Sequence, residues 1–443
     1  MVMNIELFKS ILLSLLVVLS CLLTWNVWSY QPSYTEIENT TPTVDVAIAD
    51  AQDNSELIKP SRFLVHGEET VHGTTSENEV SKLLSIMEDW NFFNVRQNNS
   101  FNEQEFKRLV HGSNRLEILF PAQVPLSAYQ DVFNFEVSQL PETTFDRIIV
   151  GFSEREEATF NVYFVSYDAR IVHEAKVERD ELAVLNQEII ANASGMYQSY
   201  FAYEAGEDRK IYLPKSVSDV IQYKYYMNRI DPQQFIDALF SDPNAVEVNS
   251  LGANEDQFFD KTSLMKVDRA TNTLNYVNPS ASDSLITGTP SDLLQKSRRF
   301  VNEHKGWTDP YRLYDLDIID QQVTYRLHVQ GLPVFNDNGA ATIEQEWRDS
   351  RIYKYDRSFM SIALQLPTAT RKASLPSGYD AIEALETLAD FDPDLLEDMM
   401  IAYRMTKDSN TEELYTLEPM WFYLYNGSWQ RVPWEGGEPV GLE

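Results

Sequence analysis

The sequence predicts an α+β fold, with one N-terminal transmembrane helix followed by a multidomain ectodomain of antiparallel sheets packed with helices. Two observations predict it. A nearly continuous apolar segment lies close to the start of the chain, and strand-like and helix-like segments then follow one another irregularly. Because these segments show no regular βαβ repeat, α+β is favoured over a doubly wound parallel sheet.

The apolar segment "LFKSILLSLLVVLSCLLTWNVWSYQP" has three common fates: cleavage as a signal peptide, lipidation, or retention as a membrane span. Cleavage is disfavoured because Trp25 and Trp28 follow the apolar core, where signal peptidase requires small residues. Lipidation of Cys21 is disfavoured because the residues after it remain apolar. Retention is favoured, since residues 10–28 are long enough to cross a hydrocarbon core of about 30 Å as a helix.

The distribution of charge predicts the orientation of this span. Lys9 lies at its near end, and no Lys or Arg occurs at positions 29–58. By the positive-inside rule, residues 1–9 form a cytoplasmic tail and everything after the span is extracytoplasmic. The predicted location is the cell membrane, with a single pass and the bulk of the chain outside. Residues 29–61 are mostly polar and are interpreted as a tether.

Composition excludes one class of partner. The 443 residues include 68 Asp and Glu against 36 Lys and Arg, giving a net charge of −32. Such a surface repels nucleic acid, so no nucleic-acid partner is expected. We interpret the acidity as a solubility feature rather than as a face for a basic partner. The single cysteine, Cys21, lies in the span, so the exported part has no disulfides, which favours a bacterium with one membrane.

The sequence predicts three ectodomain units, of which the first two precede a Pro- and Ser-rich break. The first covers residues 62–177, with a strand "RFLVHG", a helix "ENEVSKLLSIMEDW" and strands "FDRIIVGF" and "ATFNVYFVSY". The second covers residues 178–285. In it, Asp231 and Pro232 start a helix, and a hairpin turns near Asn272.

The third predicted unit, residues 290–443, follows the segment "NPSASDSLITGTPSD". A helix precedes an antiparallel meander, and the first strand of the meander alternates apolar residues at Val323, Tyr325, Leu327 and Val329. This alternation puts His328 on the polar face, where a solvated side chain is expected. A helix "YDAIEALETLADF" and a hairpin turning at Asn426-Gly427 complete the unit.

The sequence contains no GxSxG, HExxH, P-loop or CxxC motif. No catalytic residue, metal ligand or cofactor is therefore predicted, and the protein is not expected to be an enzyme. Three histidines, His66, His72 and His111, share the tripeptide VHG, which raises the question of a metal site. Their spacing is not i, i+4 and no cysteine adds a ligand, so we favour the interpretation that His-Gly marks the end of a strand.

Small and weakly polar residues recur every three or four positions within the predicted span. They are Ser10, Ser14, Val17, Cys21, Thr24 and Trp28, and on a helix they share one stripe. Small residues let two helix backbones approach closely, and hydroxyl groups can hydrogen-bond across the interface, at about 0.6–2 kcal/mol each. The stripe is therefore a candidate partner-binding face. The alternative is that Ser, Thr and Cys are tolerated in any span because they bond back to their own helix.

Four segments resemble the YycH (WalH) family of Gram-positive bacteria: "FKSILLSLLVVLSCLLTWNVWSYQPSY", "PSRFLVHG", "RFVNEHKGWTD" and "LHVQGLPVF". The resemblance extends over nearly the whole chain, and none of these segments is a catalytic signature. It implies a single-span extracytoplasmic protein that regulates the WalK/WalR two-component system of cell-wall metabolism. It also implies a multidomain α+β fold whose last part, residues 290–443, is similar to YycI.

The same resemblance implies two partners, a YycI-like membrane protein and a WalK-like sensor histidine kinase. In that family the membrane helix takes part in the contacts, which favours the partner-binding interpretation of the stripe. The expected function is a membrane-anchored regulator that modulates the sensor kinase together with YycI. The alternative is an anchored extracytoplasmic sensor that binds a wall fragment, a peptide or an ion, and it requires a pocket with convergent polar groups.

Overall fold

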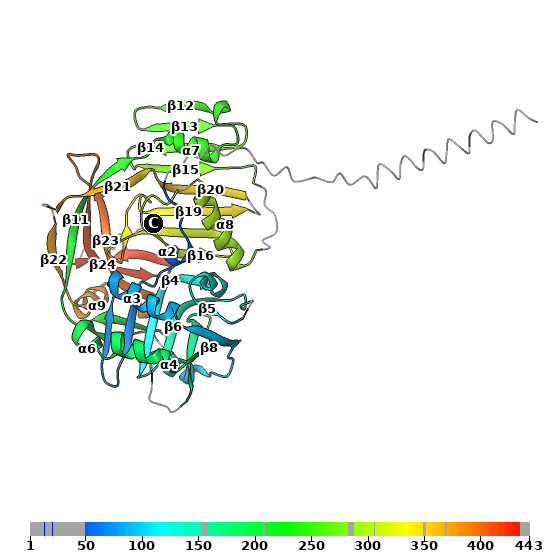
Figure 1. Ribbon diagram of the computed structural model, residues 1–443. Helices are drawn as coiled ribbons and strands as arrows, with labels where there is room; N and C mark the ends of the chain where they lie inside the picture. The colour runs from blue at the N-terminus through cyan, green and yellow to red at the C-terminus, as the bar shows by residue number, and fades with distance from the viewer. Residues whose placement is uncertain are drawn as a thin grey trace, which may run out of the picture. The chain divides into compact units, whose positions relative to one another are not determined.

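Two β-sheets, with helices packed against them, make up the part of the chain that the computed structural model describes (Figure 1). The described residues are 13, 20, 49–137, 139–152, 157–206, 209–281, 288–304, 306–348, 351–367 and 370–434. The predicted α+β class is confirmed. The sheets are mixed rather than purely antiparallel, because each contains one parallel pair among its described strands.

The first sheet has ten described strands in the spatial order β10-β9-β2-β1-β4-β6-β7-β8-β3-β5. Its neighbours are antiparallel except for β3 and β5. The bounds are β1 (Arg62–His66), β2 (Val71–Thr74), β3 (Asn91–Gln97), β4 (Arg115–Pro125), β5 (Asn134–Phe135), β6 (Thr144–Gly151), β7 (Thr159–Ser166), β8 (Ile171–Glu178), β9 (Gln198–Ala205) and β10 (Arg209–Pro214).

The second sheet has fifteen described strands, twelve of them in the order β12-β13-β14-β15-β20-β19-β17-β18-β23-β24-β11-β21, while β16, β22 and β25 pair with β17, β11 and β24. Its parallel pair is β18 and β23. The bounds are β11 (Ser218–Arg229), β12 (Glu247–Leu251), β13 (Glu255–Phe259), β14 (Leu264–Asp268), β15 (Thr273–Val277), β16 (Tyr311–Asp317), β17 (Gln322–Val329), β18 (Leu332–Phe335), β19 (Thr342–Arg348), β20 (Arg351–Ser358), β21 (Met360–Gln365), β22 (Arg371–Leu375), β23 (Leu396–Lys407), β24 (Leu414–Tyr425) and β25 (Ser428–Arg431).

The helices follow the predicted start signals closely. At α7 the Asp231 side chain accepts a hydrogen bond from the Gln233 amide and Pro232 is the first helical residue, as predicted. The described helices are α2 (Asn54–Leu57), α3 (Glu77–Glu88), α4 (Glu103–His111), α5 (Glu181–Leu185), α6 (Ala193–Met196), α7 (Pro232–Leu239), α8 (Pro290–Glu303) and α9 (Gly378–Glu386), with short 3-10 or π turns η1 (Leu126–Asp131), η2 (Asn186–Ile190), η3 (Pro243–Ala245) and η5 (Pro393–Leu395).

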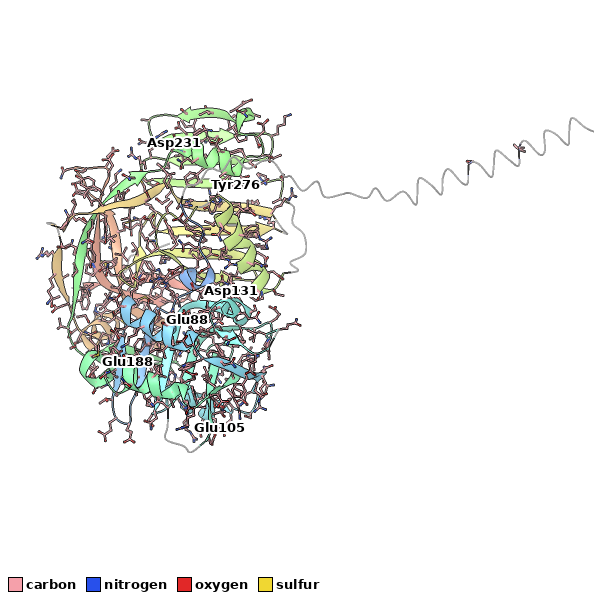
Figure 2. The ribbon with its side chains drawn as sticks, in the orientation of Figure 1. Glu88, Glu105, Asp131, Glu188, Asp231 and Tyr276 are labelled. Carbon is pink, nitrogen blue, oxygen red and sulfur yellow. The ribbon has the colours of Figure 1, made fainter. Side chains whose placement is uncertain are left out.

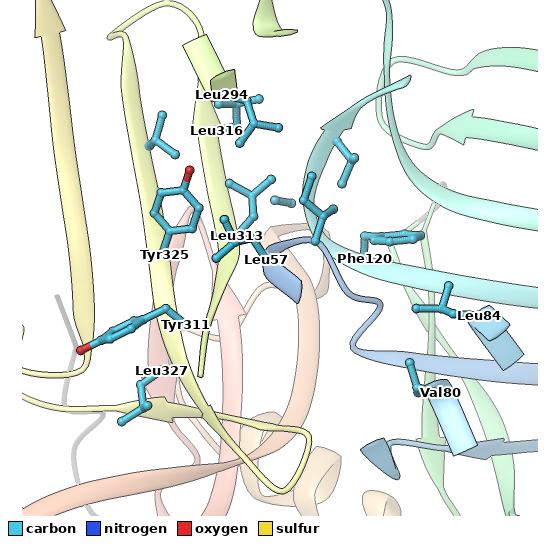
Figure 3. Packing of buried hydrophobic residues seen from close by; sticks show 14 of the residues in the cluster. Leu57, Val80, Leu84, Phe120, Leu294, Tyr311, Leu313, Leu316, Tyr325 and Leu327 are labelled. Atoms are coloured by element: carbon cyan, nitrogen blue, oxygen red, sulfur yellow. The ribbon is translucent and has the colours of Figure 1, made fainter. Parts of the chain in front are cut away.

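Apolar residues of both sheets meet in one large core. Figure 3 labels Leu57 of α2, Phe120 of β4, and Leu313 and Leu316 of β16, all of which belong to the same buried cluster. Strand β4 of the first sheet contacts β16 of the second. Burial of such side chains stabilises the fold by about 1.5–3 kcal/mol each, so this seam fixes how the two sheets pack.

The acidic residues are spread over many elements. Figure 2 labels Glu88 at the end of α3, Glu105 in α4, Asp131 in η1, Glu188 in η2 and Asp231 at the start of α7. Four of these five are exposed, and Glu188 is half-buried. This distribution supports the interpretation of acidity as a solvated surface.

The predicted domain boundaries stay predictions. Residues 45–443 form one compact unit, and the predicted second unit, 178–285, contributes strands to both sheets. The predicted span, residues 10–28, lies outside the described residues except for Leu13 and Ser20. Among the residues that the structure describes, no helix has the length and apolar character needed to cross a membrane.

Candidate functional site between the two sheets

The partner-binding stripe predicted from the sequence lies outside the described residues, and its geometry stays a prediction. The candidate site that the structure does describe is a cavity of about 610 Å³ between the two sheets. That volume is in the range of small-molecule sites. The lining comes from β1, β4, β6 and β10 of the first sheet and from β16, β17, β19, β23, β24 and β25 of the second.

A buried ion pair forms the wall on the side of the first sheet. Glu117 of β4 is fully buried and stands opposite Leu64 of β1 in the antiparallel register. Arg147 of β6 donates to Glu117 Oε1 at 2.7 Å. The ring of His66 at the end of β1 lies with Nε2 2.8 Å from Glu117 Oε2 and donates to that ionised oxygen. Both carboxylate oxygens are therefore satisfied.

A second layer of side chains surrounds this pair. The Arg147 guanidinium also donates to Asp146 at 3.1 Å and lies 3.8 Å from the ring centroid of Tyr167. The Tyr167 hydroxyl is 2.9 Å from His111 Nε2. The other ring nitrogen of His111 lies 3.9 Å from Glu117, which is too long for a hydrogen bond. The cluster thus joins β1, β4 and β6 with the end of α4.

The electrostatics of the cluster favour a structural role. Burial opposes ionisation of Glu117, but the hydrogen bond from His66 and the charge of Arg147 outweigh it and lower its pKa to about 2. Burial lowers the pKa of His111 to about 4, although Glu117 opposes this shift. In neutral solution Glu117 and His111 are therefore both proton acceptors. General acid–base catalysis needs a matched donor as well, and this pair does not supply one.

The three VHG tripeptides have three different environments. His66 ends β1, and the Gly67 amide donates to the Thr70 carbonyl at 2.8 Å, so this one marks a strand end as predicted. His72 lies inside β2, and His111 is the last residue of α4, so the strand-end interpretation is wrong for these two. No three His, Cys, Asp or Glu side chains in the described ranges are placed to hold a metal ion.

The wall on the side of the second sheet carries a buried arginine in an aromatic setting. Arg326 of β17 is 6% exposed, and its guanidinium carbon lies 4.4 Å from the Tyr314 ring centroid and 4.2 Å from that of Phe335. Its Nη1 donates to the Val334 carbonyl at 3.2 Å. Cation–π contacts of this kind hold the guanidinium plane in place.

The prediction of a solvated His328 is wrong. The side chain is 2% exposed, and its Nδ1 lies 2.9 Å from the carbonyl oxygen of Arg326. Burial, and the charge of Arg312, hold its pKa well below the ordinary value. An alternating strand implies one solvated face only when nothing covers that face. Here the face is not solvated, and Tyr314 of the paired strand β16 packs beside His328, with its ring centroid 6.4 Å from that of His328.

Charged contacts connect the two sheets around the cavity. Arg62 of β1 donates to Asp398 of β23 at 2.7 Å, and Arg209 of β10 donates to the carbonyl of Glu397 at 3.0 Å. A second cavity of about 360 Å³ adjoins the first and shares Arg62, Tyr212 and Met400 with it. No local sequence pattern indicates this site, because its residues come from strands far apart in the chain.

Two models of one protein family match most of the chain. A family model described as "YycH protein, N-terminal domain" matches residues 6–194, and one described as "YycH protein, C-terminal domain" matches residues 208–437. The two-component system WalR/WalK regulatory protein YycH of Bacillus subtilis (strain 168) is 24% identical over 443 residues, which covers 96% of each chain.

A solved structure agrees with this chain at the level of the fold. The crystal structure of YycH from Bacillus subtilis is 20% identical and has a TM-score of 0.74, covering 87% of this chain and 99% of that chain. The C-terminal domain of Bacillus megaterium YpeB is 11% identical with a TM-score of 0.24, covering 45% of this chain and 88% of that chain, and carries no structural argument.

Proposed function

Because this chain belongs to the YycH family, we propose that it is a membrane-anchored regulatory protein of a WalR/WalK two-component system. It acts in the extracytoplasmic space on a sensor kinase of the WalK type, together with a YycI-like membrane protein. The observation that carries this proposal is the extent of the match. The Bacillus subtilis relative, whose name gives it this regulatory role, aligns over 96% of each chain.

The proposed route of regulation is a contact between membrane helices. The apolar segment at residues 10–28 supports the anchor, and its stripe of small residues supports close approach of a partner helix. A contact whose strength differs between two kinase states by about 1.4 kcal/mol changes their population ratio tenfold. A single weak helix contact is therefore enough for regulation, and no chemical step is needed.

Membrane retention is the first expected result. We expect the full-length protein to fractionate with membranes and to keep its N-terminal residues, because Trp25 and Trp28 disfavour cleavage. Protease added outside the cell should digest the part after residue 30. The measurements are membrane fractionation and intact mass. An N-terminus near Ser29, or a diacylglycerol on Cys21, would contradict the proposed topology.

The second expected result concerns substitution of the stripe of small residues in the span. Ser14→Leu together with Cys21→Leu should weaken co-purification with the kinase or the YycI-like protein and change WalR-dependent reporter output by roughly threefold to thirtyfold, because bulky residues separate the helices. These changes raise the hydropathy of the span, so membrane insertion is retained.

The matched control for this experiment is Leu15→Ile together with Val18→Leu, which alters the span away from the stripe. This variant should behave like the unsubstituted protein at equal membrane abundance. If both variants give the same reporter output, the stripe does not carry the contact, and the regulatory surface lies in the ectodomain instead.

A further inference from the structure

We propose that the cavity between the two sheets binds a small zwitterionic ligand, of the class of short peptides with free ends, whose carboxylate is held by Arg326 and Tyr314. Both residues line the cavity and both are more than nine-tenths buried, at 6% and 7% exposed. This binding site goes beyond the proposed contact with the kinase and does not rest on it.

Arg326 is distinguished by its lack of a carboxylate partner. Five cationic side chains line the cavity, and four of them have such a partner within 4 Å: Arg62 with Asp398, Arg147 with Glu117, Arg209 with Asp168, and Lys210 with Glu204. Within the described part of the chain, Arg326 has none. A buried guanidinium with no carboxylate in direct contact is costly, since Glu344 acts on it only from a longer distance, and an anionic ligand group would supply the direct partner.

The available hydrogen-bond donors fit a carboxylate. Of the five N–H groups of Arg326, one donates to Val334 O, and the buried Nε–H has no partner among the described residues. The buried hydroxyl of Tyr314 also lacks a partner in this part of the structure. Buried donors are nearly always satisfied. Four unsatisfied donors line the cavity, the Nε–H groups of Arg62, Arg147 and Arg326 and the Tyr314 hydroxyl, and of the three arginines only Arg326 also lacks a carboxylate partner among the described residues. A guanidinium fork pairs with the two oxygens of a carboxylate.

The carboxylates near Arg326 select a ligand that also carries a positive charge. Asp315 of β16 and Glu344 of β19 both stand opposite Thr324 of β17 in the register, and both are exposed within the cavity lining. Neither has an ion pair in the described residues. These two carboxylates lie level with Thr324, which is two residues along β17 from Arg326 and therefore about 7 Å away from it. They repel a purely anionic ligand and attract an ammonium group a few bonds from the bound carboxylate.

Titration of the full-length protein with the dipeptide L-alanyl-L-alanine tests the proposal, with calorimetry and thermal stability as the two measurements. The dipeptide should bind, its C-terminal amide should not, and the N-acetylated dipeptide and acetate should bind more weakly. Failure of the free dipeptide to bind at up to about 10 mM would overturn the proposal. Equal binding of the amide would overturn the role of the carboxylate, and equal binding of acetate would overturn that of the ammonium group.

Two substitutions locate the ligand. Arg326→Met should weaken dipeptide binding by about a hundredfold, and Tyr314→Phe by about tenfold. Tyr379→Phe is the matched control, since Tyr379 is 50% exposed and lies outside both cavities, and should leave binding unchanged.

Protein stability separates this ligand role from a purely structural one. Arg326→Met removes an uncompensated buried charge, so the unliganded variant should unfold at the same or a higher temperature than the unsubstituted protein. If the Met variant does not fold, Tyr314→Phe alone decides the site. Unchanged dipeptide binding in the variants would place the ligand elsewhere and overturn the assignment.

Discussion

Replacing Glu117 with alanine is expected to lower the free energy of unfolding by about 3–5 kcal/mol. Glu117 is fully buried and accepts hydrogen bonds from Arg147 and His66 at 2.7 and 2.8 Å. Removing the carboxylate leaves the Arg147 guanidinium, whose side chain is 11% exposed, with a weakened counter-charge in the protein interior. The cost is dominated by that stranded charge rather than by the lost contact. Denaturant unfolding measures it directly.

A surface pair provides the control for the Glu117 experiment. Glu56 pairs with Lys59 at 2.7 Å, but the Glu56 side chain is 59% exposed, so Glu56→Gln should cost less than about 1 kcal/mol. The double variant Glu117→Leu with Arg147→Met should recover much of the stability lost by Glu117→Leu alone, because both charges are then absent. A loss of less than about 1 kcal/mol for Glu117→Ala would show that the cluster is not a stabilising ion pair.

Acidification is expected to destabilise the protein steeply below pH 6.5. Burial lowers the pKa of His111 to about 4 and that of His304 to about 3, and holds that of His328 well below its ordinary value. The charges of neighbouring arginines act in the same direction on all three. Unfolded histidines protonate near pH 6.5, so below that pH the unfolded state binds more protons than the folded state does.

The sign and size of this pH effect follow from linkage. The stability associated with these histidines is fully present above pH 6.5 and is lost as the pH falls toward the folded pKa values. Each such proton contributes a slope of about 1.4 kcal/mol per pH unit, so three give about 4 kcal/mol per unit. Glu117, with its pKa lowered to about 2, adds a further loss between pH 4.5 and 2.

Unfolding by denaturant at several pH values measures this slope. About 0.5 M salt should be present, because the net charge of −32 also changes its self-repulsion on acidification and salt screens that effect. His304→Gln is the informative variant. It should reduce the slope of stability against pH by about 1.4 kcal/mol per pH unit, which is the contribution of one proton. Stability that stays constant from pH 7 to pH 4.5 would contradict the buried neutral histidines.

Local sequence patterns predicted the helix starts and the turns, whereas the cavity between the two sheets is formed by tertiary contacts. The capped start at Asp231 and Pro232 and the turn at Asn426-Gly427 are set by neighbours in the chain, and both predictions are confirmed; Asn426 and Gly427 have φ of 49° and 75°.

The residues of the cavity illustrate why the rest was not predictable. Arg326 and His328 look solvated because an alternating pattern records only the strand they belong to. In the structure both are buried, and both pack against Tyr314, which comes from the neighbouring strand β16. Glu117 and His66 meet through the pairing of β1 with β4, across 51 positions of sequence. A single sequence holds no signal for such a long-range contact among 68 acidic residues.

Strand β18 joins the two halves of the second sheet through a short ladder on each side. Its ladder has two register pairs with β17, and two with β23, whereas β23 and β24 pair along almost their whole lengths. Few backbone hydrogen bonds tie β18 to its neighbours, whereas all four of its residues are buried, so side-chain packing rather than the ladder holds the two halves of the sheet together. The Arg326 guanidinium of β17 also donates a hydrogen bond to the Val334 carbonyl of β18. This one side chain therefore helps to determine how tightly the two halves of the sheet are coupled.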